Sequence, residues 1–313
     1  MINVSNLSKY FDDFCAVDDI SFSVGAGEVL GFLGPNGAGK STTMKMLTGF
    51  LAPSSGEISI MGFNLKADLL KAQQVIGYLP EGAPAYADMT VKASLRFIGE
   101  ARGFSGADLQ VRIDSVVAQV ALDSVLGKRI DNLSKGYRRR LGIAQTLLHD
   151  PQVLILDEPT DGLDPNQKHQ VRELIRNLAK DKIVIVSTHI LEEVSAVCSR
   201  AMILAEGKVL FDGTPTALAA QSDFHNAVTV RVSRTTEALL SALEALSVVK
   251  KVVAGDSDSM TIFPTEGQPI LAEVNRVIQE QACQVEELHV EVGRLDDVFR
   301  KLTLTPTELE ASL

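Results

Sequence analysis

The sequence contains no tryptophan and only three cysteines among 313 residues. Cys15, Cys198 and Cys283 lie far apart and form no Cys-x-x-Cys pair, which argues against a zinc site or a disulfide framework and suits a reducing compartment. No run of about 18 apolar residues occurs, so no segment is expected to span a membrane by itself. The N-terminus also lacks the charged-then-apolar pattern of a signal peptide.

Basic residues are scarcer than acidic ones. The chain has 30 Lys and Arg against 40 Asp and Glu, a net charge of −10, and no long basic block. Nonspecific nucleic-acid binding depends on neutralising phosphates with Lys and Arg, so we expect no nucleic-acid partner. The length allows two domains, and a composition that is 45% hydrophobic and 22% charged is typical of globular proteins.

A glycine-rich loop is the strongest motif in the sequence. Residues 34–42 read GPNGAGKST and contain the phosphate-binding pattern G-x-x-x-x-G-K-[ST]. Glycines let the backbone approach an anion closely, and successive N–H groups then cradle the phosphates. An apolar stretch at residues 28–33 predicts a buried strand before the loop, and residues 42–47 predict a helix whose N-terminal dipole faces the anion. The predicted nucleotide-binding residues are Gly34, Pro35, Asn36, Gly37, Ala38, Gly39, Lys40, Ser41 and Thr42.

Two carboxylates follow the all-apolar residues 153–156. Asp157 and Glu158 are therefore expected at the carboxyl end of a buried strand, where α/β sheets bind ligands. One carboxylate can hold Mg²⁺ and the next can orient or deprotonate a water molecule. Residues 183–188 predict another buried strand that ends at His189. A histidine there, beside a phosphate site, is more often functional than structural.

Two further stretches leave alternatives open from the residues alone. Ser134 would cap a helix, and Gly136 would leave its first turn open to a close ligand. An ordinary capped helix with a solvated basic face explains the same stretch. Tyr10 and Phe11, upstream of the glycine loop, are either core residues or platforms for a nucleotide base.

Taken together, residues 2–220 resemble the nucleotide-binding domain of an ABC transporter. Residues 34–41 match Walker A, residues 153–158 match Walker B, and residues 133–137 match the ABC signature. Residues 161–165 match the D-loop and His189 the switch histidine. The resemblance implies that two cassettes pair head to tail, with each ATP between Walker A of one chain and the signature of the other.

The same resemblance implies a role for each matching residue. It implies Glu158 and His189 as catalytic residues, Phe11 as the base-stacking aromatic, and Ser134, Gly136 and Asp164 as further nucleotide contacts. Ser41, Asp157 and Glu81 are the implied ligands of Mg²⁺. Glu81 stands where the family normally has glutamine, and the alternative is that it points to solvent as a helix-capping acid.

The signature departs from the usual LSGGQ, because Lys135 and Tyr137 occupy two of its places while Ser134 and Gly136 are kept. These variants look most like the cassettes of multidrug-, antibiotic- and gliding-motility-type exporters. The resemblance therefore implies an ATP-hydrolysing subunit that powers a separate multi-span membrane permease. It would form a homodimer with ATP and attach through the permease to the cytoplasmic face of the membrane.

We predict an α/β P-loop NTPase cassette at residues 1–222, with an inserted helical lobe at about 82–150. Residues 223–313 are expected to form an accessory α+β domain with the βαββαβ order of a ferredoxin-like unit. Its role is regulation or dimer contact, or merely stabilisation.

Two other functional classes are the alternatives to a transporter subunit. One is a soluble ABC ATPase of DNA repair or translation, disfavoured by the single cassette, the acidic charge and the lack of a coiled coil or zinc hook. The other is a regulatory module whose tail senses a small ligand.

Overall fold

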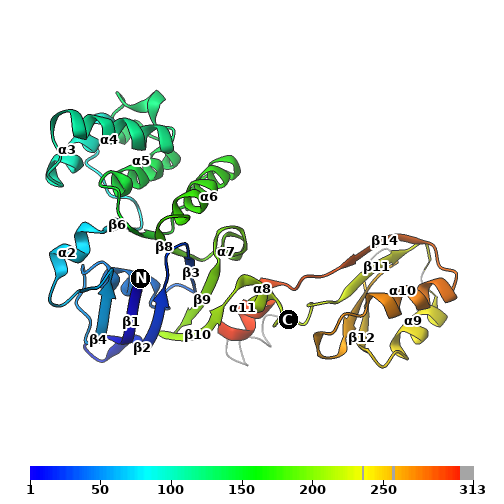
Figure 1. The fold of residues 1–313 in the computed structure, drawn as a ribbon. Helices are drawn as coiled ribbons and strands as arrows, with labels where there is room; N and C mark the ends of the chain where they lie inside the picture. Colours follow the sequence, from blue (N-terminus) through cyan, green and yellow to red (C-terminus); the bar gives the residue numbers. More distant parts are fainter. Residues whose placement is uncertain (235, 256–257, 304–313) are drawn as a thin grey trace. The chain divides into compact units, whose positions relative to one another are not determined.

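The computed structural model describes residues 1–234, 236–255 and 258–303, which divide into two compact units. The first unit is Met1–Gly213 and the second begins at Thr214. The first unit contains two sheets and the second contains one (Figure 1). Each unit has its own hydrophobic core. The division therefore falls at Gly213, whereas the sequence analysis placed it after residue 222.

A six-stranded sheet in the order β10-β9-β3-β8-β7-β6 is the centre of the first unit. Neighbouring strands from β9 to β6 are parallel, and only β10 runs antiparallel at its edge. Parallel strands are buried on both faces, which is why their sequences are continuously apolar. The strands are β3 (Val29–Leu33), β6 (Ile76–Leu79), β7 (Val153–Asp157), β8 (Ile183–Thr188), β9 (Arg200–Ala205) and β10 (Lys208–Gly213).

A four-stranded antiparallel sheet, in the order β2-β1-β4-β5, belongs to the same unit. Its inner residues share one core with the central sheet and with helix α1 (Lys40–Leu47): Leu7, Met44 and Ile155 are all fully buried members. This shared core holds the start of α1, and so the glycine loop, against the central sheet. The four strands are β1 (Ile2–Phe11), β2 (Phe14–Val24), β4 (Ser55–Ile60) and β5 (Phe63–Asn64).

Helices α3, α4 and α5 form one group in the first unit (Figure 1), and α5 also packs against β6. They pack through apolar residues at helical spacing, such as Leu95, Leu109 and Leu141, each at most 4% exposed. Gly99 of α3 permits this packing, because a Cβ there would lie 2.2 Å from Leu109. Besides α1, the α-helices of the unit are α2 (Leu69–Gln74), α3 (Val91–Ala101), α4 (Gly106–Gln119), α5 (Lys135–Leu147), α6 (Pro165–Ala179) and α7 (Leu191–Val197).

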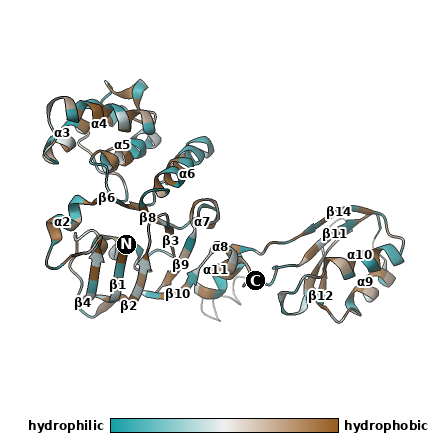
Figure 2. Cartoon of the chain, in the orientation of Figure 1, coloured by the Kyte–Doolittle hydropathy of each residue, from teal (hydrophilic) through white to brown (hydrophobic). Residues whose placement is uncertain are grey.

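The second unit contains an antiparallel sheet in the order β12-β13-β11-β14. Helices α9 and α10 show both hydrophobic and hydrophilic stretches (Figure 2), and their apolar residues share one core with the sheet. Gly293 packs against Ala219 of α8, which explains why α8 groups with this unit. The elements are α8 (Pro215–Ala219), β11 (Val228–Val232), α9 (Glu237–Glu244), β12 (Val249–Ala254), β13 (Ser259–Pro264), α10 (Leu271–Glu280), β14 (Val285–Val290) and α11 (Leu295–Thr303).

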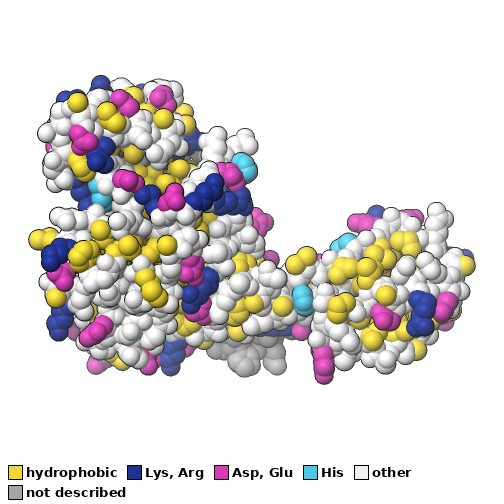
Figure 3. All heavy atoms as spheres, in the orientation of Figure 1, with side chains coloured by type: hydrophobic (Ala, Val, Ile, Leu, Met, Phe, Trp, Pro, Cys, Tyr) yellow, Lys and Arg dark blue, Asp and Glu magenta, His cyan; other side chains and the backbone are white. Residues whose placement is uncertain are grey.

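Acidic and basic side chains are interspersed on the face of the molecule seen in Figure 3. Within the described residues, none of the helices combines the length and the apolar character needed to cross a membrane.

Candidate functional site

The glycine loop joins β3 to α1 and has a geometry that only glycine permits. Gly37 and Gly39 have φ angles of +83° and +98°, in the region that L side chains rarely adopt. A Cβ on Gly39 would lie 2.6 Å from the Ala16 carbonyl oxygen, and one on Gly34 would lie 2.2 Å from that of Leu204. Gly39 is also the N-cap of α1, so the loop leads directly into a helix N-terminus that favours anions.

Lys40 is the first residue of α1 and is only 7% exposed. Its ammonium group donates to the carbonyl oxygens of Gly34, at 2.6 Å, and Pro35, at 3.0 Å. Burial lowers the pKa of Lys40, while the nearby Glu158, Asp157 and Glu81 raise it. The lysine is thus held over the loop, with its charge facing the acidic residues of the site.

A pocket of about 230 Å³ brings most of the predicted site residues together. Phe11 lines it and is 46% exposed. Tyr10 does not line the pocket but is 48% exposed, so the alternative that either aromatic is a core residue is wrong. Phe14, which the sequence analysis missed, also lines the pocket at 61% exposed. It belongs to β2, beside Phe11 in the β1–β2 register. The remaining lining residues are Ala16, Asn36, Gly37, Ala38, Gly39, Lys40, Ser41, Thr42, Glu81 and Glu158.

Asp157 and Glu158 lie at the carboxyl end of β7, as the sequence predicts. The missed residue here is Ser187, which pairs in register with Asp157 on the parallel strand β8 and is completely buried. Its hydroxyl donates a short hydrogen bond to Asp157 Oδ1 and accepts one from the backbone N–H of Glu158 at 3.0 Å. One serine therefore orients both carboxylate residues. Its position at a strand end was the only signal in the sequence.

Glu158 and His189 face each other. His189 Nδ1 lies 3.0 Å from both carboxylate oxygens of Glu158, and the backbone of Glu158 has a positive φ of 51°. Such a conformation is uncommon for a residue other than glycine and often marks a functional site. Burial raises the pKa of Glu158, and the hydrogen bond and charge of His189, together with Lys40, oppose this rise. The raised pKa favours a carboxylate that accepts a proton.

Arg139 is a third residue that the sequence analysis missed. It belongs to the basic run at the start of α5, for which a solvated face was one interpretation, yet it is 4% exposed. Its guanidinium donates to the backbone carbonyls of Pro80, at 3.3 Å, of Asp157, at 3.2 Å, and of Glu158. The helix of the signature is thereby tied to the strand end that carries the carboxylates.

The oxygen ligands expected for Mg²⁺ are Ser41, Asp157 and Glu81. Ser41 and Glu81 line the same pocket. Asp157 is 2% exposed, and its charge reaches Lys40 in the same pocket. Hydroxyl and carboxylate oxygens are the hard ligands that Mg²⁺ prefers, so this donor set fits the ion. Glu81 follows the end of β6 in an exposed turn, and the next helix begins only at Val91, so Glu81 reaches solvent as the alternative expected but caps no helix.

The signature residues do not line this pocket. Ser134 is the exposed N-cap of α5 and accepts from the backbone N–H of Tyr137 at 3.4 Å. Gly136 is buried, and a Cβ there would lie 2.2 Å from Gln167 Oε1. The sequence analysis expected the first turn of α5 to be open to a ligand. In the structure, the Gln167 side chain of α6 occupies that space. Asp164 caps α6 by accepting from the N–H of Gln167 at 2.9 Å.

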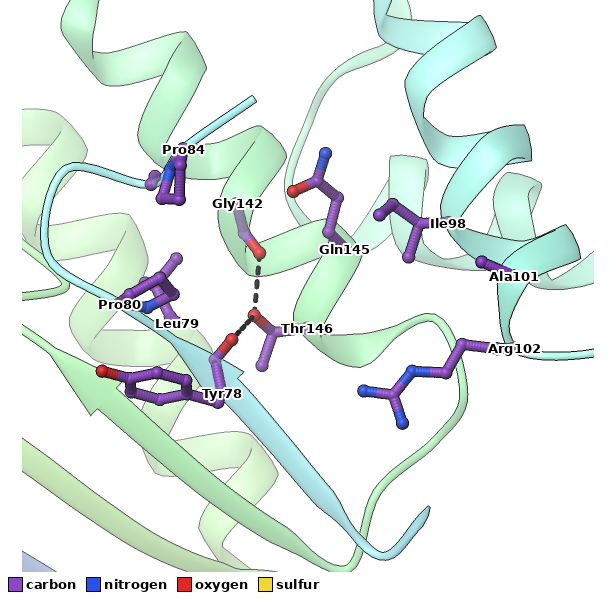
Figure 4. Close-up of a pocket in the computed structure, with 11 residues that line it drawn as sticks. Tyr78, Leu79, Pro80, Pro84, Ile98, Ala101, Arg102, Gly142, Gln145 and Thr146 are labelled. Carbon is purple, nitrogen blue, oxygen red and sulfur yellow. Dashed lines mark hydrogen bonds between the residues drawn. The ribbon is translucent and has the colours of Figure 1, made fainter. Parts of the chain in front are cut away.

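A separate groove of about 250 Å³ lies between the end of β6 and helices α3 and α5 (Figure 4). Thr146 Oγ1 lies between Gly142 O, at 2.8 Å, and Tyr78 O, at 3.3 Å, and its single hydrogen is available to either carbonyl (Figure 4). Ile98, Arg102 and Pro84 border it. The segment from Leu79 to Glu81 connects this groove to the phosphate pocket, because Pro80 lines the groove and Glu81 the pocket.

Comparison with known proteins agrees with the motifs. A family model described as ABC transporter matches residues 17–161. The Nod factor export ATP-binding protein I of Paraburkholderia xenovorans is 33% identical over 303 residues, covering 96% of each chain. A probable multidrug ABC transporter ATP-binding protein of Escherichia coli K12 is 38% identical over 223 residues, covering 71% of this chain.

This chain spans only 38% of the length of that E. coli relative. Among solved structures, an ATP-binding subunit of an ABC transporter superimposes with a TM-score of 0.65 and 32% identity. That match covers 71% of this chain and 92% of the other.

Proposed function

Because this chain belongs to the family of ABC transporter ATP-binding proteins, we propose that it hydrolyses ATP at the pocket between β1, the glycine loop and β7. The resemblance predicted from the motifs is confirmed. The main support for ATP hydrolysis is a single pocket that is lined by residues from distant parts of the sequence. They are Phe11, the glycine loop with Lys40, Glu81 and Glu158.

In the proposed reaction, the loop N–H groups and Lys40 hold the phosphates, and Phe11 or Phe14 stacks on the base. Glu158 accepts a proton from the attacking water, and His189, 3.0 Å from it, holds its carboxylate in place. Ser41 and Asp157, with Glu81, are the residues that would hold Mg²⁺. When bound, Mg²⁺ neutralises charge on the β- and γ-phosphates.

We further propose that two copies of the chain pair around ATP, so that Ser134 and Gly136 of one complete the site of the other. Ser134 is exposed at the N-terminus of α5 and does not line the phosphate pocket of its own chain. A helix N-terminus favours anions, so Ser134 is free to contact the ATP of a second copy. The partner in the membrane is a multi-span permease, for which the groove at Tyr78 and Thr146 offers a docking site beside Glu81. The names of the relatives support export, with the subunit held at the cytoplasmic face by its permease.

For the second unit we propose a ferredoxin-like accessory domain. Support comes from its strand-helix order and from a fully antiparallel sheet in which the first strand lies between the third and the fourth. The cassette proper would end between residues 213 and 222. A regulatory or dimer-contact role, or simple stabilisation, is compatible with this fold.

Replacing Glu158 with Gln tests the proposed chemistry. The variant should retain ATP binding and lose turnover by about 10²–10⁴-fold, since an amide cannot accept the proton. Single-turnover hydrolysis and the affinity for ATP are the measurements. Glu57→Gln, an exposed change on β4, is the matched control and should behave like the native protein. Turnover near the native rate in Glu158→Gln would remove this residue from the role.

Mixing two inactive variants tests the shared site. Lys40→Ala removes phosphate binding and Ser134→Arg blocks the opposite surface, so a mixed dimer contains one intact site. Activity should reappear on mixing, and sedimentation with ATP should show a dimer when Glu158 is also changed to Gln. A native protein that is fully active as a monomer would contradict head-to-tail pairing.

Glu81→Gln tests the assignment of Glu81 to the metal. A carboxylate repels the γ-phosphate unless the cation is bound, so ATP affinity should depend more steeply on Mg²⁺ in the native protein than in the variant. Superimposable titrations at several Mg²⁺ concentrations would place Glu81 outside the metal site.

A further inference from the structure

Glu193 of α7 is a buried carboxylate outside every matched motif. It is 4% exposed, and an ionised carboxylate is costly to bury unless several partners compensate it. Its partners come from three other elements of the first unit. They are Thr160, after the end of β7, Thr188, at the end of β8, and Lys168 and Arg172, on α6.

The contacts to the two threonines are direct. Thr160 Oγ1 donates a short hydrogen bond to Glu193 Oε1, and Thr188 Oγ1 donates to Oε2 at 2.9 Å. Both threonines are at most 3% exposed. Each carboxylate oxygen is therefore used by a different strand end, and water does not compete for either contact.

The two threonines flank the catalytic pair in the sequence. Thr188 immediately precedes His189, and its hydroxyl also accepts from the N–H of Ile190 at 3.0 Å. The N–H of Glu193 donates back to Ile190 O at 3.1 Å. The residues before and after His189 are therefore both bonded to Glu193, Thr188 to its side chain and Ile190 to its backbone.

Thr160 lies two residues after Glu158, in the turn where Asp161 N–H donates to Glu158 O at 3.1 Å. The positive φ of Glu158 needs surrounding contacts to maintain it, and the hydrogen bond from the buried Thr160 to Glu193 fixes the turn two residues further along. The side chain of Glu193 therefore links the segment that follows Glu158 to the segment that carries His189, and these two residues make the 3.0 Å contact.

The positive charges complete the arrangement. Lys168 Nζ lies 3.9 Å and Arg172 Nη2 3.8 Å from Glu193 Oε1. Both belong to α6, which begins directly after its N-cap Asp164. The cations offset the cost of burying the carboxylate and connect it to the helix that follows the D-loop.

We propose that Glu193 is a positioning residue for ATP hydrolysis, which sets the distance between Glu158 and His189 by holding Thr160 and Thr188. The inference rests on the roles proposed above for Glu158 and His189. It predicts a defect in the chemical step rather than in nucleotide binding, because no atom of Glu193 lines the phosphate pocket.

Glu193→Gln is the principal test, since the amide keeps the shape and can accept from only one threonine. We expect kcat to fall by about 10–100-fold with KM for ATP changed by less than about 3-fold. Glu192→Gln, the same change at the exposed neighbouring position on α7, should leave both constants at native values. A native kcat in Glu193→Gln, or a change confined to KM, would overturn the proposal.

A double-mutant cycle separates positioning from a general structural effect. In a His189→Ala background, Glu193→Gln should lower kcat by less than about 3-fold, because the geometry that it maintains has already lost its partner. An equal fractional loss in both backgrounds would indicate independent effects and refute the inference.

Two isosteric changes keep the test valid if Glu193→Gln fails to fold. Thr160→Val and Thr188→Val each remove one hydroxyl and should lower kcat by about 5-fold or more. Thr261→Val in the second unit, where the hydroxyl lies 3.2 Å from that of Thr229, is the control. Native kcat in both threonine variants would refute the role of Glu193. Glu158→Gln is assayed in parallel: full activity there refutes the proposed base, whereas its loss with no effect of the Glu193 and threonine changes refutes only this inference.

Discussion

Buried polar side chains are distributed unequally between the two units. Among the described residues, Ser222 is the only buried polar side chain in the second unit. The others all lie in the first unit, and they include Lys40, Arg139, Asp157 and Glu193. Because burying a charge costs free energy unless it is partnered, each buried charge of the first unit needs specific partners.

The second unit is stabilised differently. Its core is apolar, with Val230, Ile262 and Val274 fully buried between sheet and helices. Its ion pairs, such as Arg231 with Glu287 and Lys301 with Asp223, are largely exposed, and such pairs contribute little. The comparison indicates that the first unit contains the reaction chemistry, whereas the second unit depends mainly on apolar burial.

The largest expected difference between the two units is the effect on kcat of removing a buried serine hydroxyl. Each unit has a buried serine that donates to an aspartate. Ser187→Ala removes the hydrogen bonds to Asp157 and to the N–H of Glu158 and should lower kcat about 10–100-fold. Ser222→Ala removes a 3.1 Å contact with Asp297 and should leave kcat unchanged. Steady-state ATPase assays of both variants measure the two kcat values. Equal losses in the two would break the comparison.

A second difference concerns acid stability. His149 Nε2 bonds Ile76 O at 3.0 Å, and burial, together with the charge of Arg102, lowers the pKa of His149 to about 4. The unfolded chain, with an ordinary value of about 6.5, binds this proton more readily. The histidine therefore contributes stability above about pH 6.5, and that contribution, at most about 3 kcal/mol, is lost as the pH falls towards 4.

His149→Gln should weaken this pH dependence, because glutamine can still donate to Ile76 O and does not titrate. Urea unfolding of the first unit at pH 7 and pH 4.5 measures the change. His225→Gln, which affects a 2.9 Å contact with Val292 O in the second unit, serves as the control and should keep the native pH dependence. Identical pH dependence in all three proteins would contradict the assignment.

The smallest expected effect is that of removing the second unit. A chain ending at Gly213 should fold and bind ATP within about 3-fold of the native affinity, because the pocket residues all belong to the first unit. A chain ending at Ser222 should aggregate more readily, since it keeps the fully buried Leu218 of α8 but lacks α11, against which α8 packs. Circular dichroism and nucleotide titration test both chains. Aggregation of the shorter chain would show that the two units share a core.

Local sequence was sufficient for the motif residues. The loop at residues 34–42 follows from glycine stereochemistry, and the placement of Asp157, Glu158 and His189 follows from apolar strands that end at polar residues. The helical periodicity of α3, α4, α9 and α10 was also readable, because one apolar face is enough to predict a helix. These features depend on residues that are close together in the chain.

Other assignments needed contacts between distant segments. Arg138, Arg139 and Arg140 look alike in sequence, but the packing of α5 against β6 and β7 turns only Arg139 into the interior. Gly136 looked open until α6 placed Gln167 against it. Ser187 and Thr188 looked like ordinary strand residues.

The sequence by itself thus determined which nucleotide chemistry this protein carries, because the phosphate loop and the carboxylates are local patterns of residue type and spacing. Only the tertiary structure decided what holds those groups in position. Ser187, Arg139 and Glu193 acquire their partners from strands and helices far away in the chain. A buried polar group is identified by its partners, and partners are a property of the fold.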